Sequence, residues 1–112
     1  MNISYEGIGH LAVTMPAGEC EAGQVCVMGE DGQVAGGTAG GKFCGVVEAV
    51  ENGMAAVQVA GFVTLGYTGT APTTGYANLA CDGNGTVAVN STGNSYLVVA
   101  VDTANNLVTF KL

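Results

Sequence analysis

The chain carries little charge, and positive charge is almost missing. Its 112 residues include nine acidic residues but only two basic ones, Lys42 and Lys111, so the formal net charge is −7 at pH 7. Charged residues make up 10% of the sequence, whereas about 25% is usual in soluble domains. Binding to nucleic acid requires a basic patch that neutralises phosphates. Two Lys cannot form such a patch, and we expect no nucleic-acid partner.

Side chains that commonly hold metals or sugars are also scarce. There is no Trp, aromatic residues make up 6% of the chain, and His10 is the single His. The cysteines contain no CxxC pair, so the sequence predicts neither a zinc site nor a cofactor. We predict instead that the four cysteines are reduced thiols, buried or half-buried in a cytoplasmic protein: Cys20, Cys26, Cys44 and Cys81.

Signals for export and for membrane insertion are missing as well. Residues 1–6 contain neither a basic region nor an apolar run, so they do not resemble a signal peptide. Residues 52–81 carry no charge, but Gln58, Pro72, five Thr and several Gly interrupt them. Such a composition does not suit a membrane-spanning helix. We expect synthesis in the cytoplasm and no membrane partner.

Glycine and valine dominate what the chain does contain. There are 19 Gly, and 16 Val outnumber the eight Leu and Ile residues together. The hydrophobic content of 48% is high enough to form a core and argues against disorder. β-Branched residues favour strands over helices. The length fits one domain, residues 1–112, with residues 1–10 as an N-terminal arm.

Turn-forming pairs divide the chain into short strands. Asn52-Gly53 is the strongest hairpin signal, because Asn and Gly both accept positive φ angles. Asp31-Gly32 and two further segments, residues 82–85 and 103–106, predict turns by the same chemistry. Residues 57–65 alternate as one strand, and a single helical turn is expected near residues 75–80. The predicted fold is a small all-β barrel or sandwich of about eight short, mostly antiparallel strands.

Two glycine motifs resemble nucleotide-binding sequences. Residues 36–42 match the P-loop pattern GxxxxGK, but Phe43 stands where Ser or Thr would bind magnesium. A P-loop also joins a strand to a helix, whereas the residues after Lys42 have the composition of a strand. Residues 7–12 fit the pattern GxGxxA of dinucleotide-binding folds, and we interpret them as a glycine-rich entry into a strand around residues 11–14. We expect no nucleotide binding.

The chain offers no clear set of catalytic groups. A hydrolase needs a nucleophile, a base and an orienting group in mutual reach. His10 is the one candidate base, and the serines lie in terminal or turn contexts: Ser4, Ser91 and Ser95. We interpret three carboxylate pairs as solvated surface: Glu19/Glu21, Glu30/Asp31 and Glu48/Glu51. Calcium binding through Glu30, Asp31 and Asp82 lacks the expected ligand spacing. We predict that the chain is not an enzyme and assign no catalytic, cofactor-binding or metal-binding residue.

The charges are distributed unevenly along the chain. Seven of the nine acids precede residue 52, and only Asp82, Asp102 and Lys111 are charged after it. Residues 54–56, 79–81 and 97–101 are apolar or small on both faces of their strands. Either both faces are buried inside the domain, or a neighbouring subunit covers one of them. We favour partial cover by neighbours, and therefore expect self-association.

Several segments follow one another in a familiar order: residues 11–18, 22–26, 32–35, 40–46 and 56–65. In this order they resemble the small capsid decoration proteins, also called head auxiliary or cement proteins, of tailed bacteriophages and prophages. The part from residues 69–76 through 96–102 is similar to small prophage proteins associated with head genes. The resemblance spans residues 11–112 and consists of strand and glycine positions, without a catalytic signature.

This resemblance implies a β-rich fold that assembles as a homotrimer or as a cluster linking capsomers. It implies docking onto the outer surface of the shell built by the phage major capsid protein. A ligand that binds only the assembled lattice lowers the free energy of that state, which stabilises the shell without any reaction. The chain is then expected in the virion, after synthesis in the cytoplasm of the bacterial host. Residues 1–10 match no part of the family, and their role as a capsid-contacting arm is a hypothesis.

Two other functions stay open. The chain could be another virion component, such as the base of a head fibre or a tail accessory. It could also be a small β-barrel module that binds a ligand or carbohydrate. That function requires a pocket with convergent aromatic and polar groups, and four Tyr and three Phe supply few aromatic side chains.

Overall fold

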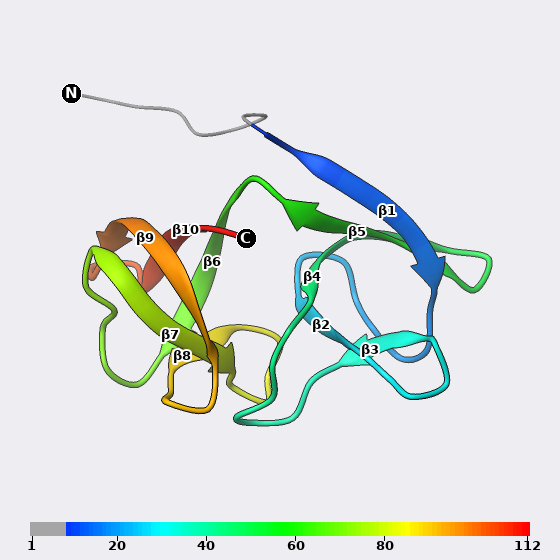
Figure 1. Ribbon diagram of the computed structural model, residues 1–112, viewed down its shortest axis with the longest axis horizontal. Coiled ribbons are helices and arrows are strands. Elements are labelled where there is room, and N and C mark those ends of the chain that lie inside the picture. The colour runs from blue at the N-terminus through cyan, green and yellow to red at the C-terminus, as the bar shows by residue number, and fades with distance from the viewer. Residues whose placement is uncertain (1–8) are drawn as a thin grey trace.

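The computed structural model describes residues 9–112, which form ten strands and no helix. The strands divide into two groups that lie side by side in Figure 1, β1 to β5 on the right and β6 to β10 on the left. Their bounds are β1 Leu11–Pro16, β2 Val25–Met28, β3 Val34–Gly36, β4 Gly45–Glu51, β5 Met54–Ala60, β6 Phe62–Thr68, β7 Gly75–Cys81, β8 Val87–Val89, β9 Asn94–Asp102 and β10 Leu107–Lys111. The all-β prediction is confirmed, with two more strands than expected.

The first five strands form one antiparallel sheet in the order β1-β5-β4-β2-β3. The predicted hairpin joins β4 to β5, where Asn52 and Gly53 have φ angles of 53° and 75°. On the far side of this sheet the chain covers the edge of β3 itself. Gly18 N–H donates to Val34 O at 2.8 Å, and Gly36 N–H donates to Glu19 O at 2.9 Å. Of the two outer strands, β3 is therefore protected by its own chain.

The last five strands close into a small barrel in the order β10-β6-β8-β7-β9. Every neighbouring pair is antiparallel except β6 and β8, which run parallel. The two-residue parallel pairing of β6 with the short β8 completes the ring. Asp82 holds the turn that leads into β8: its carboxylate accepts hydrogen bonds from Asn84 N–H at 2.7 Å and from the Thr68 hydroxyl at 3.1 Å. Residues 103–106 form the predicted turn, and residues 82–85 lie in the bend that joins β7 to β8.

Gly61 separates the two sheets, and here the prediction of one strand over residues 57–65 was wrong. Gly61 has a φ angle of 96° and bends the chain, so that β5 belongs to the sheet and β6 to the barrel. The buried amide of Gln58 spans the bend, donating to Ala60 O at 3.1 Å and to Phe62 O at 3.2 Å. An unbroken apolar alternation therefore runs through two strands that face different cores.

Each sheet encloses its own core. The sheet core is small and consists of Cys26, Val34, Val47, Ala55 and Val57. The barrel core is larger and contains nine residues of the barrel strands together with Val25, Phe43 and Val46 from the sheet side. Phe43 stacks on Tyr96 with a centroid distance of 5.0 Å and meets Phe110 edge-on at 6.0 Å. Because Val25, Phe43 and Val46 pack into the barrel core, the sheet and the barrel form one compact domain.

Two further expectations were settled by the barrel. Residues 75–80 are not a helical turn, because the whole segment pairs with β9 and β8 as β7. Residues 79–81 are apolar on both faces because they are buried on both faces within the chain, with exposures of 0–2%. Burial inside the molecule, rather than a neighbouring subunit, accounts for the absence of charge at residues 79–81.

Candidate functional site

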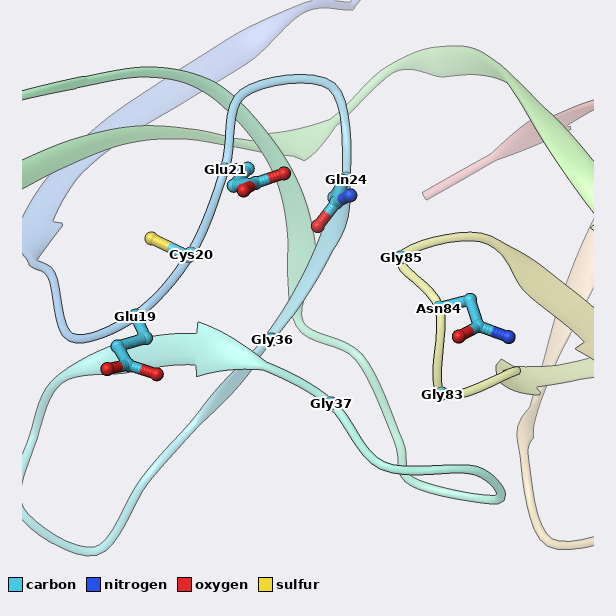
Figure 2. Close-up of a pocket in the computed structure, with 9 residues that line it drawn as sticks. All are labelled: Glu19, Cys20, Glu21, Gln24, Gly36, Gly37, Gly83, Asn84 and Gly85. Carbon is cyan, nitrogen blue, oxygen red and sulfur yellow. The ribbon is translucent and has the colours of Figure 1, made fainter.

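An open cleft of about 640 Å³ lies at the junction of the two sheets. Figure 2 shows one wall formed by the segment that carries Glu19, Cys20, Glu21 and Gln24, and the other formed by residues 83–85. Beside the cleft, Val25 N–H donates to Gly85 O at 3.0 Å and so joins the sheet to the barrel loop. A side chain at position 85 would collide with Gln24. The glycines here therefore allow the barrel loop to approach the sheet closely.

The cleft is polar but holds no evident catalytic set. Its lining contains two carboxylates, an amide from Gln24, a second amide from Asn84 and no aromatic side chain, so it offers no stacking platform for a sugar ring. Within residues 9–112, no three His, Cys, Asp or Glu side chains group as a metal site. Every buried side-chain nitrogen and oxygen in that range has a hydrogen-bond partner. Glu19 and Glu21 thus come together at this cleft, whereas the other candidate residues lie elsewhere.

The segment that matches a P-loop fastens the sheet to the barrel. Gly36 ends β3, and the chain after Lys42 continues into β4 as predicted, not into a helix. The loop between these strands pairs with the end of β7: Gly40 N–H donates to Cys81 O and Cys81 N–H donates to Gly41 O, both at 2.9 Å. A side chain at Gly37 would collide with the Cys81 thiol. The glycines are needed for this close docking, which their sequence pattern alone did not reveal.

The candidate catalytic residues do not assemble. His10 Nε2 contacts Glu48 Oε1 at 2.5 Å, which joins the start of β1 to β4 on the surface. Ser91 lies in the turn after β8 and Ser95 in β9, while Ser4 lies outside the described residues. Two of the calcium candidates, Asp31 and Asp82, each stabilise a different turn. Asp31 accepts a hydrogen bond from Gln33 N–H in the β2–β3 turn, whereas Asp82 holds the β7–β8 turn.

The most distinctive surface is the outer side of β1, which we call the open edge. β1 ends the strand order of the sheet, and no other described strand pairs with its outer side. The strand reads LAVTMP and contains no charged residue. Leu11 is 54% exposed and Val13 is 40% exposed. Exposed large apolar side chains also occur at Met54 on the neighbouring strand β5 and at Val50 on β4, one strand further into the sheet.

An open edge of this kind is unusual because unpaired backbone groups on an edge strand recruit other strands. Proteins normally prevent this with charged side chains, bulges or a covering segment. In this sheet the exposed end of β4 carries Glu48 and Glu51, and β3 is covered by residues 17–19. β1 has one register shift at its start and a Pro at its end, but no charge. The structure thus leaves one outer strand that can accept a neighbour.

Comparisons with known proteins supply no identity. No family model matches the chain, and neither the curated proteins nor the solved structures contain a match. The resemblance to capsid decoration proteins therefore stays a prediction. Among residues 9–112 there is also no helix long and apolar enough to cross a membrane.

Proposed function

We propose that the chain is a structural virion protein that binds the outer surface of an assembled phage capsid and stabilises the shell. The observation that supports this proposal most strongly is the open edge. An uncharged outer strand with exposed Leu11 and Val13 suits lasting contact with another protein chain. The resemblance of residues 11–112 to decoration proteins supplies the kind of partner, the major capsid protein and further copies of this chain.

The physical basis for such binding is strand addition. A neighbouring strand that pairs with β1 gains backbone hydrogen bonds along its length, and the exposed side chains of Leu11 and Val13 provide apolar contacts. The low charge removes the electrostatic repulsion that normally keeps edges apart. The remaining surface of the sheet is acidic, so this surface does not bind the phosphates of packaged DNA.

Binding to the lattice would stabilise the shell by mass action. A protein that binds the assembled capsid and not its free subunits lowers the free energy of the assembled state. Hundreds of weak contacts then act together, so the chain needs neither a catalytic group nor a tightly bound ligand. The polar cleft at the sheet junction has no role in this proposal.

The experiment is a composition analysis of purified phage particles from a host that carries this gene. We expect quantitative mass spectrometry to find hundreds of copies per head, and electron microscopy to show added density on the outer shell. A few copies per particle, or copies confined to the tail, would contradict capsid decoration and favour another virion component. Saturable binding of a glycan by the isolated monomer would favour the carbohydrate-binding alternative.

The oligomeric state provides a second check with purified protein. Sedimentation velocity at physiological salt should show self-association that grows with concentration, toward a trimer or a larger cluster. A chain that remains a monomer at all concentrations and never associates with capsids would contradict the proposal.

A further inference from the structure

Two thiols lie close together in the sheet, where β2 pairs with the start of β4. Cys26 is in β2 and fully buried, whereas Cys44 directly precedes β4 and is half-buried. Their Sγ atoms are 3.9 Å apart. The backbone also holds them together, because Cys44 N–H donates to Cys26 O at 2.8 Å. This pair is separate from the open edge and from the proposed function.

We propose that Cys26 and Cys44 form a redox-active thiol pair, in which Cys44 reacts with small disulfides and Cys26 then closes an intramolecular disulfide. A disulfide bond is about 2.05 Å long, so the two sulfurs must approach by roughly 2 Å. The backbone hydrogen bond already places the two residues on adjacent segments. Closure therefore calls for side-chain rotation and a small local adjustment, not for separation of the strands.

The two thiols differ in a way that assigns their roles. Cys44 is the more exposed, and the hydrogen bond that its thiol shares with Cys26 lowers the pKa of Cys44 to about 7. The same hydrogen bond, together with burial, raises the pKa of Cys26. Because the thiolate is the nucleophile in exchange reactions, Cys44 attacks first and the buried Cys26 resolves.

The reaction balances with a small organic disulfide such as oxidised glutathione. The Cys44 thiolate attacks one glutathione sulfur, which forms a mixed disulfide and releases one glutathione thiol. Cys26 then loses its proton and attacks Cys44 Sγ, which forms the Cys26–Cys44 bond and releases the second glutathione thiol. The protein loses two protons and two electrons, and both pairs are recovered in the two reduced glutathione molecules.

The disulfide would cross-link two segments of the sheet, beside the aromatic contact that joins the sheet to the barrel. Cys44 follows Phe43, which stacks on Tyr96 in the barrel core. A cross-link from Cys26 to Cys44 closes a loop that includes the glycine-rich segment docked on β7. Restricting such a loop in the unfolded chain stabilises the native fold. Oxidation should therefore raise the free energy of unfolding.

The test uses a full-length variant in which Cys20→Ser and Cys81→Ser leave only this pair. After incubation with oxidised glutathione, free-thiol titration should fall from two thiols to none, and the intact mass should fall by two hydrogen atoms. Trypsin cuts after Lys42, between the two cysteines, so fragments 1–42 and 43–111 should stay joined until a reductant is added. The melting temperature should rise by about 10 °C on oxidation.

The matched control is Cys26→Ser with Cys44→Ser, which retains Cys20 and Cys81. This variant should form no internal disulfide under the same conditions. Two free thiols in the first variant, or a lasting glutathione adduct on Cys44, would overturn the proposal, as would equally fast internal oxidation of the control. Oxidised wild-type protein must also yield the Cys26–Cys44 peptide by mass spectrometry, which excludes an artefact of the serine substitutions.

Discussion

The barrel and the sheet contain five strands each, but the barrel has no edge strand, whereas the sheet has two. In the barrel every strand has a neighbour on both sides, and the parallel pair of β6 and β8 closes the ring. In the sheet β3 is covered by residues 17–19, while β1 has no described neighbour on its outer side. Closure leaves the barrel without an edge to protect, whereas the sheet keeps one edge free for contact.

Because of this difference, the scarcity of charge has one explanation in the barrel and another consequence in β1. The barrel can be nearly uncharged because closure removes the edges that charges would otherwise protect. Its strand residues 79–81 are hidden within the chain itself. In β1 the same lack of charge leaves an exposed edge that is limited only by a register shift at its start and by Pro16 at its end. Composition alone cannot separate these cases, and only the second supports a surface for neighbours.

The largest expected effect comes from adding one methyl group where backbones touch. Gly93→Ala in the barrel places a Cβ against the Leu79 carbonyl, and Gly45→Ala in the sheet places one against the Gln58 carbonyl. Neither carbonyl can move without breaking its strand, so each change should cost roughly 4 kcal/mol of unfolding free energy. Urea unfolding would measure the loss.

Gly36→Ala is the control for both, because a methyl group there meets its nearest atom at an ordinary 3.8 Å. Its stability should stay within about 1 kcal/mol of wild type. If Gly93→Ala and Gly36→Ala had the same stability, the close approach of the barrel turn to β7 would be refuted.

The bend between the two regions should be the next most sensitive feature. Gln58→Met keeps the side-chain size but removes both hydrogen bonds to the carbonyls of Ala60 and Phe62. We expect a loss of about 2 kcal/mol in chemical unfolding. Gln33→Met, at an exposed turn, should change stability by less than about 0.5 kcal/mol. Equal effects of the two substitutions would mean that the amide does not hold the bend.

The aromatic contact between the regions can be measured by a double-mutant cycle. Phe43 comes from the sheet loop and Phe110 from the barrel, and their rings meet edge-on at 6.0 Å. Phe43→Leu and Phe110→Leu should show a coupling energy of about 1 kcal/mol. Additive effects would indicate that the two regions are stabilised independently.

Acid should slightly reduce the stability that Asp82 gives to the β7–β8 turn. Burial alone would raise the pKa of Asp82, but hydrogen bonds from Thr86, Asn84 and Thr68 outweigh it and lower the pKa below the ordinary value. A carboxylate with a depressed folded pKa stabilises the fold above about pH 4, and this contribution disappears as the pH falls further. Between pH 5 and pH 2, Asp82→Asn should lose less unfolding free energy than wild type does. The difference between the two losses should be under about 1 kcal/mol. Identical acid sensitivity in both proteins would contradict this.

Local chemistry allowed the turns and the strand content to be predicted, but not the division into two sheets. Asn52-Gly53 dictates its hairpin because both residues adopt positive φ. At Gly61 the apolar alternation continues unchanged through the bend, so the pattern reads as one strand. The short β8 pairs in parallel with a strand distant in sequence, and such pairings have no local signature.

The functional features were only partly visible in the sequence. The residues of β1 could be recognised as an uncharged strand, but its place at the end of the sheet depends on long-range pairing with β5. The sequence separation of Cys26 and Cys44 resembles no motif, and the two thiols meet only because β2 pairs with β4. The glycines of residues 36–41 suggested a phosphate loop, whereas their contacts serve docking on β7.

The central claim is that the open edge, and not the barrel, contacts neighbouring chains. The most direct measurement is the number of copies on purified particles for wild type, Val13→Lys and Val89→Lys. Val13 on β1 and Val89 on β8 are 40% and 43% exposed, so a Lys at either site should leave the fold intact. We predict that Val89→Lys is retained like wild type and that Val13→Lys is lost. Full retention of Val13→Lys, or selective loss of Val89→Lys, would contradict the account.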